Sequence, residues 1–272
     1  MIEFEILNEV KRIAIEVGHR IMNLYDSSYV VEEKSDGSPL TIADRIAHNF
    51  ICDQLRTLTP NMPLLSEESV GIDIEERLIW KRFWLVDPLD GTKEFISRNG
   101  EFTVNIAMIE EGHPILGVVH APAKKLTYFA ASEQGAWRQL EDCVPEKIMT
   151  KQYHGGAARM VSSRSHASKM VERFRRALET RSRQPVQQLA MGSSLKFCLV
   201  AEGRADVYPR LGATSEWDTG AAHCVVEEAG GSILRCDSKR LTYNKCDLRN
   251  PWFVAMGDST YSWLELCPNE HG

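Results

Sequence analysis

The segment Phe83–Phe95 constrains this chain more than any other, because an expected buried strand leads directly into two carboxylates. The first four residues of the segment are aromatic or aliphatic, which is typical of a strand inside a protein. Pro88 fixes its own φ and has no N–H donor, so we expect the chain to turn where the strand ends. Asp87, Asp90 and the carbonyl oxygen of Leu89 can then converge on one point beyond the strand.

Three hard oxygen atoms at one point suit Mg²⁺, which proteins usually hold with one or two carboxylates and complete with water and substrate phosphate. Gly91 lets the backbone approach closely, and the amides of Gly91 and Thr92 would face an anion if a helix begins there. Asp, Pro and Gly also dominate ordinary turns for local reasons. The pentapeptide alone is therefore compatible with a metal site and with a simple turn.

Two more acidic motifs lie far from this segment in the sequence. Glu67 and Glu68 follow a short expected strand, and Trp217-Asp218 opens an expected helix. In isolation the glutamate pair would be a solvated acidic loop, and Asp218 would be a favourable charge at a helix N-terminus. The functional interpretation therefore depends on all three motifs occurring together.

The segment Trp-Leu-Val-Asp-Pro-Leu-Asp-Gly-Thr and these two motifs resemble the motifs of the inositol monophosphatase superfamily, which consists of Mg²⁺-dependent, lithium-sensitive phosphatases. The three motifs also occur in the same order as in that superfamily. The resemblance implies a layered αβαβα sandwich of the sugar-phosphatase type, combining α+β and α/β parts, with the active site between two subdomains. It also implies that two or three Mg²⁺ ions are bound. The implied metal ligands are Glu67, Asp87, the Leu89 carbonyl, Asp90 and Asp218.

Asp44 and Thr92 are the expected catalytic pair. Thr41 begins a helix with Asp44 three residues later, roughly as in a capping box, and in isolation Asp44 would only be a favourable anion in a first helical turn. The resemblance implies that the Asp44 carboxylate and the Thr92 hydroxyl orient and activate the attacking water. Since a threonine is too weak a base alone, the chemistry requires the pair.

Asp-Gly-Thr-Lys-Glu-Phe, Asn-Gly-Glu-Phe-Thr-Val-Asn-Ile-Ala and Gly-Ser-Ser-Leu-Lys-Phe-Cys-Leu-Val-Ala-Glu-Gly resemble the bacterial 3′(2′),5′-bisphosphate nucleotidase branch. The expected reaction is hydrolysis of 3′-phosphoadenosine 5′-phosphate to AMP and phosphate, which would clear an inhibitory by-product of sulfate assimilation. The alternatives are a phosphatase for inositol or sugar monophosphates and a non-catalytic metal and nucleotide sensor. The complete set of ligands and catalytic residues argues against the sensor.

A second phosphate would need its own site. Ser193 and Lys196 fit a helix N-terminus with a nearby cation, although an ordinary serine cap with a solvated lysine has the same pattern. Arg210, and less strongly His166, are candidates for contacts with that phosphate or with the base. The expected substrate contacts are Glu67, Leu89, Asp90, Gly91, Thr92, Ser193, Lys196, Arg210 and Asp218.

Composition excludes several classes of partner. The net charge of -6 argues against a nucleic-acid polymer, but a small phosphorylated nucleotide stays compatible because bound cations supply local positive charge. No apolar run approaches the ~18 residues of a membrane span, and acidic residues near the N-terminus exclude a secretory signal. We therefore expect a cytoplasmic protein without a transmembrane segment, with association at the inner membrane surface left open.

The seven cysteines contain no Cys-x-x-Cys, so we expect neither zinc nor a disulfide framework and mostly buried thiols.

The 272 residues allow one large or two ordinary domains. We expect an N-terminal α+β subdomain at 1–145, which carries the metal-binding loops, and a C-terminal α/β subdomain at 146–272, which completes the metal site and binds the nucleotide. The expected helices are 6–21, 42–55, 165–178, an apolar helix that follows segment 192–197 and ends at 201, and 217–228. The expected strands are 29–33, 64–65, 83–86, a meander over 101–137, 158–162, 206–210, 233–234 and 252–255, with a loop at 34–39.

Overall fold

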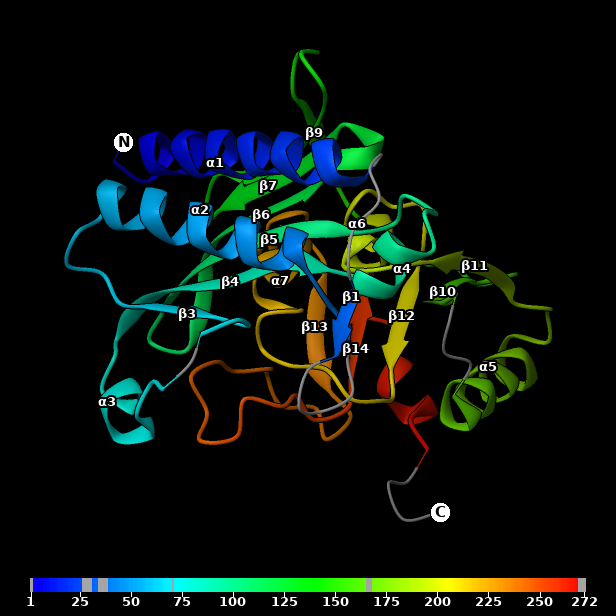
Figure 1. The fold of residues 1–272 in the computed structure, drawn as a ribbon. Helices are drawn as coiled ribbons and strands as arrows, with labels where there is room; N and C mark the ends of the chain where they lie inside the picture. Colours follow the sequence, from blue (N-terminus) through cyan, green and yellow to red (C-terminus); the bar gives the residue numbers. More distant parts are fainter. Residues whose placement is uncertain (1, 26–30, 34–38, 70, 165–167, 269–272) are drawn as a thin grey trace.

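The computed structural model describes residues 2–25, 31–33, 39–69, 71–164 and 168–268. Helices and sheets alternate in five layers (Figure 1), which confirms the αβαβα arrangement. The first half of the chain contains α1 (Ile2–Tyr25), β1 (Val31–Glu33), β2 (Pro39–Thr41), α2 (Ile42–Leu58), β3 (Leu64–Ser66), α3 (Ile74–Leu78), β4 (Arg82–Asp90), α4 (Thr92–Ile96), β5 (Thr103–Glu110), β6 (His113–Ala121), the 3₁₀ helix η1 (Pro122–Lys124), β7 (Leu126–Ala131), β8 (Gly135–Leu140) and β9 (Glu146–Ile148).

Seven strands form the larger sheet, in the order β3-β4-β5-β6-β7-β8-β9. β3 and β4 are parallel, and all other neighbours in this sheet pair antiparallel. The expected meander over 101–137 is thus confirmed. Helices cover both faces, so β4 and β5 are buried along nearly their whole length and their sequences are almost continuously apolar rather than alternating.

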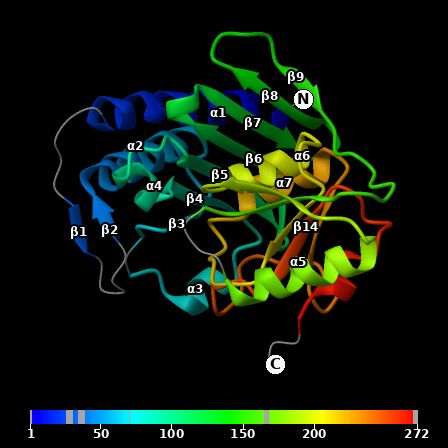
Figure 2. The same ribbon diagram turned by 90° about the vertical axis from the view of Figure 1, so that its right-hand side faces the viewer.

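α1 and α2 lie side by side on one face of the larger sheet (Figures 1 and 2). The apolar residues at helical spacing in α1 are fully buried there: Val10, Ile13, Ala14, Val17 and Ile21 are each at most 1% exposed. Burial of such a stripe removes several large side chains from water, at about 25 cal/mol per Å² of apolar surface. Because α2 is held against β4 by this packing, its N-terminal turn has a fixed position near the end of β4.

The second half contains β10 (Arg159–Ser163), α5 (Lys169–Ser182), β11 (Gln187–Met191), α6 (Leu195–Ala201), β12 (Val207–Arg210), α7 (Gly220–Glu228), β13 (Ser232–Arg235), β14 (Phe253–Met256) and the 3₁₀ helix η2 (Trp263–Leu266). Its sheet has the order β11-β10-β12-β14-β13. α6 and α7 pack between the two sheets, while α5 and η2 cover the outer face of the smaller sheet. The expected alternation of strands and helices in this half is confirmed.

Two local expectations are wrong. The chain does not turn after Val86: β4 continues through Pro88 to Asp90, with an irregular register between Asp87 and Asp90. A bulge leaves a residue unpaired, so it tolerates a proline that has no N–H to donate. In addition, α7 begins at Gly220 rather than at 217, because residues 216–219 form a separate tight turn.

The larger sheet extends past the expected boundary after residue 145, since β9 pairs with β8. α5 begins at Lys169 with Ser168 as its N-cap. The expected helix start at 165 and the candidate residue His166 lie outside the described residues. The same holds for residues 29–30 of the expected strand and for residues 34–38 of the expected loop.

We expect no disulfide framework, and the structure has one disulfide among the described residues. Cys236, after β13, and Cys267, after η2, form a disulfide because η2 returns to the end of that strand. The free cysteines within the described ranges are the buried Cys52, Cys198 and Cys224 and the exposed Cys143 and Cys246.

Among the described residues, no helix has the length and apolar character needed to cross a membrane.

Candidate functional site

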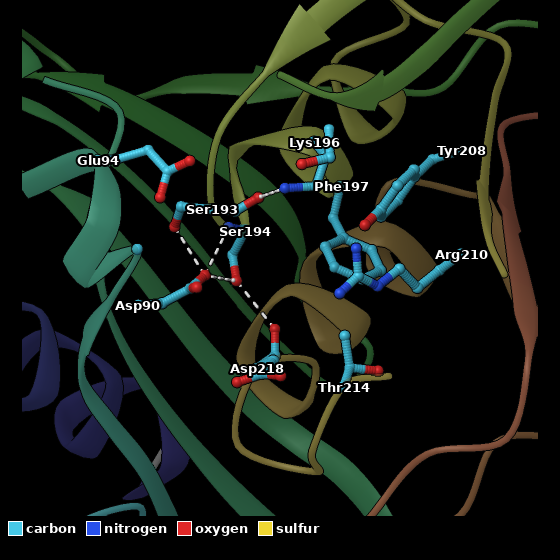
Figure 3. A pocket seen from close by; sticks show the side chains of 12 residues that line it. Asp90, Glu94, Ser193, Ser194, Lys196, Phe197, Tyr208, Arg210, Thr214 and Asp218 are labelled. Carbon is cyan, nitrogen blue, oxygen red and sulfur yellow. Dashed lines mark hydrogen bonds between the residues drawn. The ribbon is translucent and has the colours of Figure 1, made fainter. Parts of the chain in front are cut away.

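A cavity of about 140 Å³ lies where the two halves of the chain meet (Figure 3). Residues at the end of β4 and in α4 line it from one side, and residues of α6, β12 and the loop before α7 line it from the other. The lining residues are Asp90, Gly91, Glu94, Ser163, Ser193, Ser194, Lys196, Phe197, Tyr208, Arg210, Thr214 and Asp218. The cavity is therefore built from segments that are far apart in the sequence.

Three carboxylates form a cluster at this cavity. Oxygen atoms of Asp87, Asp90 and Asp218 all lie within 4.8 Å of one another. Glu67 lies next to them because β3 runs parallel to β4, where the Glu67 amide donates to the Val86 carbonyl at 3.0 Å. A hydrogen bond joins the carboxyl groups of Glu67 and Asp87 when one of them carries a proton and donates it. The fold thus gathers all four carboxylates that the sequence indicated as metal ligands.

The backbone between the two β4 aspartates approaches the same point. The Leu89 amide donates to Asp87 Oδ1 at 3.1 Å, and the Thr92 hydroxyl lies 3.4 Å from the Leu89 carbonyl oxygen. Gly91 has a φ of 92°, and a Cβ there would lie only 3.3 Å from the Glu94 carboxylate. A glycine is therefore needed for the chain to pass from β4 into α4, which begins at Thr92 as expected.

Burial and mutual repulsion weaken the acidity of this cluster. Burial raises the pKa of Asp87 well above its usual range, and the nearby charges of Glu67, Asp90 and Asp218 add to the effect. Burial likewise raises the pKa of Asp218 to about 7, with a further contribution from Asp90. Carboxylates packed this closely need a compensating positive charge in order to ionise together.

The raised pKa of Asp218 predicts a pH-dependent stability in metal-free protein. An unfolded aspartate titrates near 3.8, so the folded state holds a proton that the unfolded state has released between pH 4 and pH 7. The contribution of this group is therefore present below pH 4 and is lost as pH rises through 7. We expect wild-type protein in a chelator to lose roughly 2–4 kcal/mol of unfolding free energy over this window, relative to Asp218→Asn. Urea unfolding of both proteins at several pH values measures the difference, and parallel curves would contradict the assignment.

Asp44 and Thr92 meet at the edge of the cluster. The Thr92 hydroxyl donates to Asp44 Oδ1 at 3.2 Å. The second oxygen, Asp44 Oδ2, accepts from the amide and the hydroxyl of Thr41, both at 2.6 Å. The capping box is thus present, and it fixes a 2% exposed carboxylate with one oxygen directed at Thr92.

Asp90 joins the two halves of the chain. Its Oδ2 atom accepts from the Ser193 hydroxyl at 2.7 Å, from the Ser194 amide at 2.7 Å and from the Ser194 hydroxyl at 2.8 Å (Figure 3). In this structure the donors of the serine segment are directed at Asp90, and the contact of Ser193 with a substrate phosphate stays a prediction. Ser193 still lines the cavity.

Lys196 and Arg210 line the cavity on the same side as Asp218, and Asp90 and Glu94 line the other side. Lys196 is 6% exposed and donates from Nζ to the Ser193 carbonyl at 2.6 Å, which excludes the alternative of a solvated lysine. Burial lowers the pKa of Lys196 to about 8, and Asp90 opposes this shift. Arg210 donates from Nη2 to the Ala213 carbonyl at 2.6 Å, while its buried Nε has no hydrogen-bond partner among the described residues.

Two buried polar residues of β5 were missed by the sequence analysis. Thr103 and Asn105 are both fully buried. The Asn105 side chain donates to the Ser194 hydroxyl at 2.9 Å and the Thr103 hydroxyl lies 2.5 Å from that of Ser193, so both support the serines that contact Asp90. Polar residues at alternate positions of an otherwise apolar strand were the available signal.

Comparison with known proteins identifies the family. Residues 4–252 match the model of the inositol monophosphatase family, and the chain belongs to this family. It is 47% identical over 251 residues to a Salmonella typhimurium protein named 3′(2′),5′-bisphosphate nucleotidase CysQ, covering 91% of this chain and 98% of that protein. A Haemophilus influenzae protein of the same name is 39% identical over 263 residues, covering 96% of each.

Structural comparison agrees. The fold matches the crystal structure of CysQ from Bacteroides thetaiotaomicron, a bacterial member of the inositol monophosphatase family, with a TM-score of 0.82 and 39% identity. The match covers 93% of this chain and 97% of that protein. The resemblance found in the sequence is confirmed.

Enzymes of this family depend on metal ions, and the residues present fit such an ion. The clustered carboxylates provide hard oxygen atoms, and their mutual repulsion is what a bound cation would relieve.

Proposed function

We propose that this chain is a Mg²⁺-dependent 3′(2′),5′-bisphosphate nucleotidase that hydrolyses 3′-phosphoadenosine 5′-phosphate to AMP and phosphate. The observation that carries the proposal is the distribution of charge around one cavity. The carboxylates of Asp90, Glu94 and Asp218 and the cationic side chains of Lys196 and Arg210 line the same cavity. A cavity with this arrangement fits a ligand that has one phosphate at the cation site and another at the basic side chains.

Glu67, Asp87, Asp90, Asp218 and the Leu89 carbonyl would hold two or three Mg²⁺ ions. When bound, these ions would offset the negative charge of the phosphoryl oxygens. They would also lower the pKa of a bound water so that it can act as a nucleophile. The Thr92 hydroxyl donates its proton to Asp44 Oδ1, so the threonine oxygen keeps its lone pairs for a hydrogen bond from the attacking water. The water proton passes through the Thr92 hydroxyl toward Asp44 as the new P–O bond forms. The P–O bond to the ribose oxygen breaks, and that oxygen leaves on AMP and takes up a proton from solvent water.

The basic side chains would bind the second phosphate of the substrate. Arg210 and Lys196 offer charge-assisted donors, and the unpartnered Nε of Arg210 is available for such a bond. A second cavity of about 280 Å³ shares Ser163, Tyr208 and Arg210 with the first and has room for part of the nucleoside. We propose a small phosphorylated nucleotide, and no nucleic-acid polymer, as the partner.

We also propose that the two parts of the chain expected at 1–145 and 146–272 work as two subdomains, with β9 (Glu146–Ile148) belonging to the first. The first would supply Asp44, Thr92 and most metal ligands, and the second would supply Asp218 and the nucleotide contacts. Since the by-product of sulfate assimilation would accumulate in the cytoplasm, we place the enzyme there. Inhibition by Li⁺ stays a prediction from the family resemblance.

A phosphate-release assay with Mg²⁺ tests the function. We expect 3′-phosphoadenosine 5′-phosphate to have a kcat/KM about 100-fold above that of inositol 1-phosphate, because a monophosphate leaves the basic side chains of the cavity unpaired. Addition of a chelator should abolish release. Equal rates on both substrates would favour a less selective sugar phosphatase, and the absence of any release would favour a non-catalytic binding protein.

A further inference from the structure

Of the three clustered carboxylates, only Asp218 comes from the second half of the chain. Its distance from Asp87 and Asp90 therefore depends on how the loop before α7 is held. That loop is not part of a sheet or a long helix. Within the loop, the Ser215 amide donates to Asp218 Oδ2 at 2.8 Å, which orients the carboxylate but does not fix the loop itself.

The loop rests on a later segment of chain, residues 244–250. The Glu216 amide donates to the Leu248 carbonyl at 2.9 Å. The Asn250 amide donates to the Thr214 carbonyl at 2.7 Å, and the Asn250 side chain donates to the Ser215 carbonyl at 2.7 Å. Because these bonds involve the backbone of the loop on both sides of Glu216, segment 244–250 holds the loop from one side, and the Ser194 hydroxyl holds it from the other by donating to the Asp218 carbonyl at 2.9 Å.

Glu216 binds this segment through its side chain. Its carboxylate is fully buried, and it accepts from the Asn244 amide at 2.7 Å, from the Lys245 amide at 3.0 Å and from Lys245 Nζ at 2.5 Å. A buried carboxylate is tolerated only with such partners, so its position is closely defined. Asp218 lies two residues further along the chain.

Arg77 binds the same segment from the first half of the molecule. This residue of α3 is 3% exposed and donates to the Asn244 side-chain oxygen at 2.7 Å, to the Lys245 carbonyl at 2.7 Å and to the Cys246 carbonyl at 3.2 Å. The Asn244 side chain donates back to the carbonyls of Arg77 at 2.9 Å and Trp80 at 3.2 Å. Asn244 has a φ of 65°, a conformation that asparagine tolerates better than most residues.

We propose that Arg77, Asn244 and Glu216 are positioning residues, which hold Asp218 at the distance from Asp87 and Asp90 that a divalent cation requires. The inference rests on the proposed function for the use of that cation. Arg77 fixes segment 244–246 to α3, the segment holds Glu216, and Glu216 fixes the turn that carries Asp218. Partners of metal ligands in other proteins typically change metal affinity 10–100-fold when they are replaced.

The test measures Mg²⁺ binding by calorimetry, without substrate, on wild type, Asn244→Gly and Glu216→Gln. Asn244→Gly removes the side-chain contacts, keeps the positive φ and changes no charge, so it isolates geometry from electrostatics. We expect the dissociation constant for Mg²⁺ to rise about 10-fold in both variants. The Mg²⁺ concentration for half-maximal phosphate release should rise by the same factor. The KM for the bisphosphate nucleotide at saturating Mg²⁺ should stay within about twofold of the wild-type value.

Glu202→Gln is the matched control. The Glu202 carboxylate is 3% exposed and also joins the two halves, since it accepts from the Tyr128 hydroxyl at 3.0 Å and from Arg138 at 2.9 Å. It does not line the cavity. We expect this control to lower the melting temperature without changing the Mg²⁺ dissociation constant.

The proposal is overturned if Asn244→Gly and Glu216→Gln behave like the control, with a lower melting temperature and unchanged Mg²⁺ binding. Should Glu216→Gln fail to fold, Asn244→Gly decides alone. If the wild type itself binds no Mg²⁺, the proposed function fails and this inference fails with it. If the wild type binds Mg²⁺ and hydrolyses the bisphosphate while both variants match it, only the positioning role is lost.

Discussion

Asp90→Asn is expected to lower kcat for the bisphosphate nucleotide by on the order of 10³-fold while the protein stays folded. Asp90 contributes one of the clustered carboxylates, so we expect loss of its charge to weaken the proposed cation site. An asparagine keeps a side-chain carbonyl oxygen that can accept from Ser193 and Ser194, as Oδ2 does now. The substitution also removes repulsion with Asp87 and Asp218, so the melting temperature in a chelator should be unchanged or higher.

Thermal melts and phosphate-release rates on the same samples check this result. Wild-type protein should gain melting temperature on addition of Mg²⁺, because the ion binds the folded state, and the variant should lose most of that gain. Asp206→Asn is a suitable control, since Asp206 is a buried aspartate that binds Arg159 elsewhere in the second half. It should be less stable but keep kcat within about threefold. Near-normal Mg²⁺-dependent turnover by Asp90→Asn would remove Asp90 from the metal site.

The sequence predicted the fold and the gathering of the carboxylates for a physical reason. Strands that are recognisable from their apolar residues carry or directly precede Glu67, Asp87 and Asp90. Thr41 is a recognisable N-cap of the helix that places Asp44. Such signals are local, so they can be interpreted without knowing the rest of the structure. The prediction that Asp218 joins these carboxylates depended on the family resemblance, since nothing in the sequence around Asp218 indicates which loop it will face.

The contacts between the two halves could not be predicted in this way. Glu216 and Asn244 lie in loops without periodicity, and Arg77 lies 167 residues from Asn244. The same limit applies to Ser193 and Ser194, whose donors are directed at Asp90 instead of outward. A serine-rich helix start has the same sequence pattern in both cases, and only the position of a carboxylate about 100 residues away decides between them.

The contact between Ser193 and Asp90 also changes the expected effect of replacing Lys196. From the sequence alone, Lys196→Ala should affect only a substrate with a second phosphate. In the structure Lys196 also holds the Ser193 carbonyl, and the Ser193 hydroxyl binds Asp90. We therefore expect loss of the lysine to disturb the proposed cation site as well as the proposed contact with the second phosphate. We expect Lys196→Ala to lower kcat/KM for monophosphate and bisphosphate substrates alike, with the larger loss on the bisphosphate.

Arg210→Ala should separate the two substrates cleanly. Arg210 lines the cavity, and its side chain donates to the backbone carbonyl of Ala213 in the loop that leads to Asp218. A charge-assisted contact to a second phosphate is worth ~1.5–3 kcal/mol, so kcat/KM for the bisphosphate should fall about 10–100-fold. A monophosphate has no second phosphate to contact Arg210 and should change less than about threefold. Steady-state kinetics with both substrates measure the ratio, and equal losses would mean that Arg210 supports the loop to Ala213 rather than the substrate.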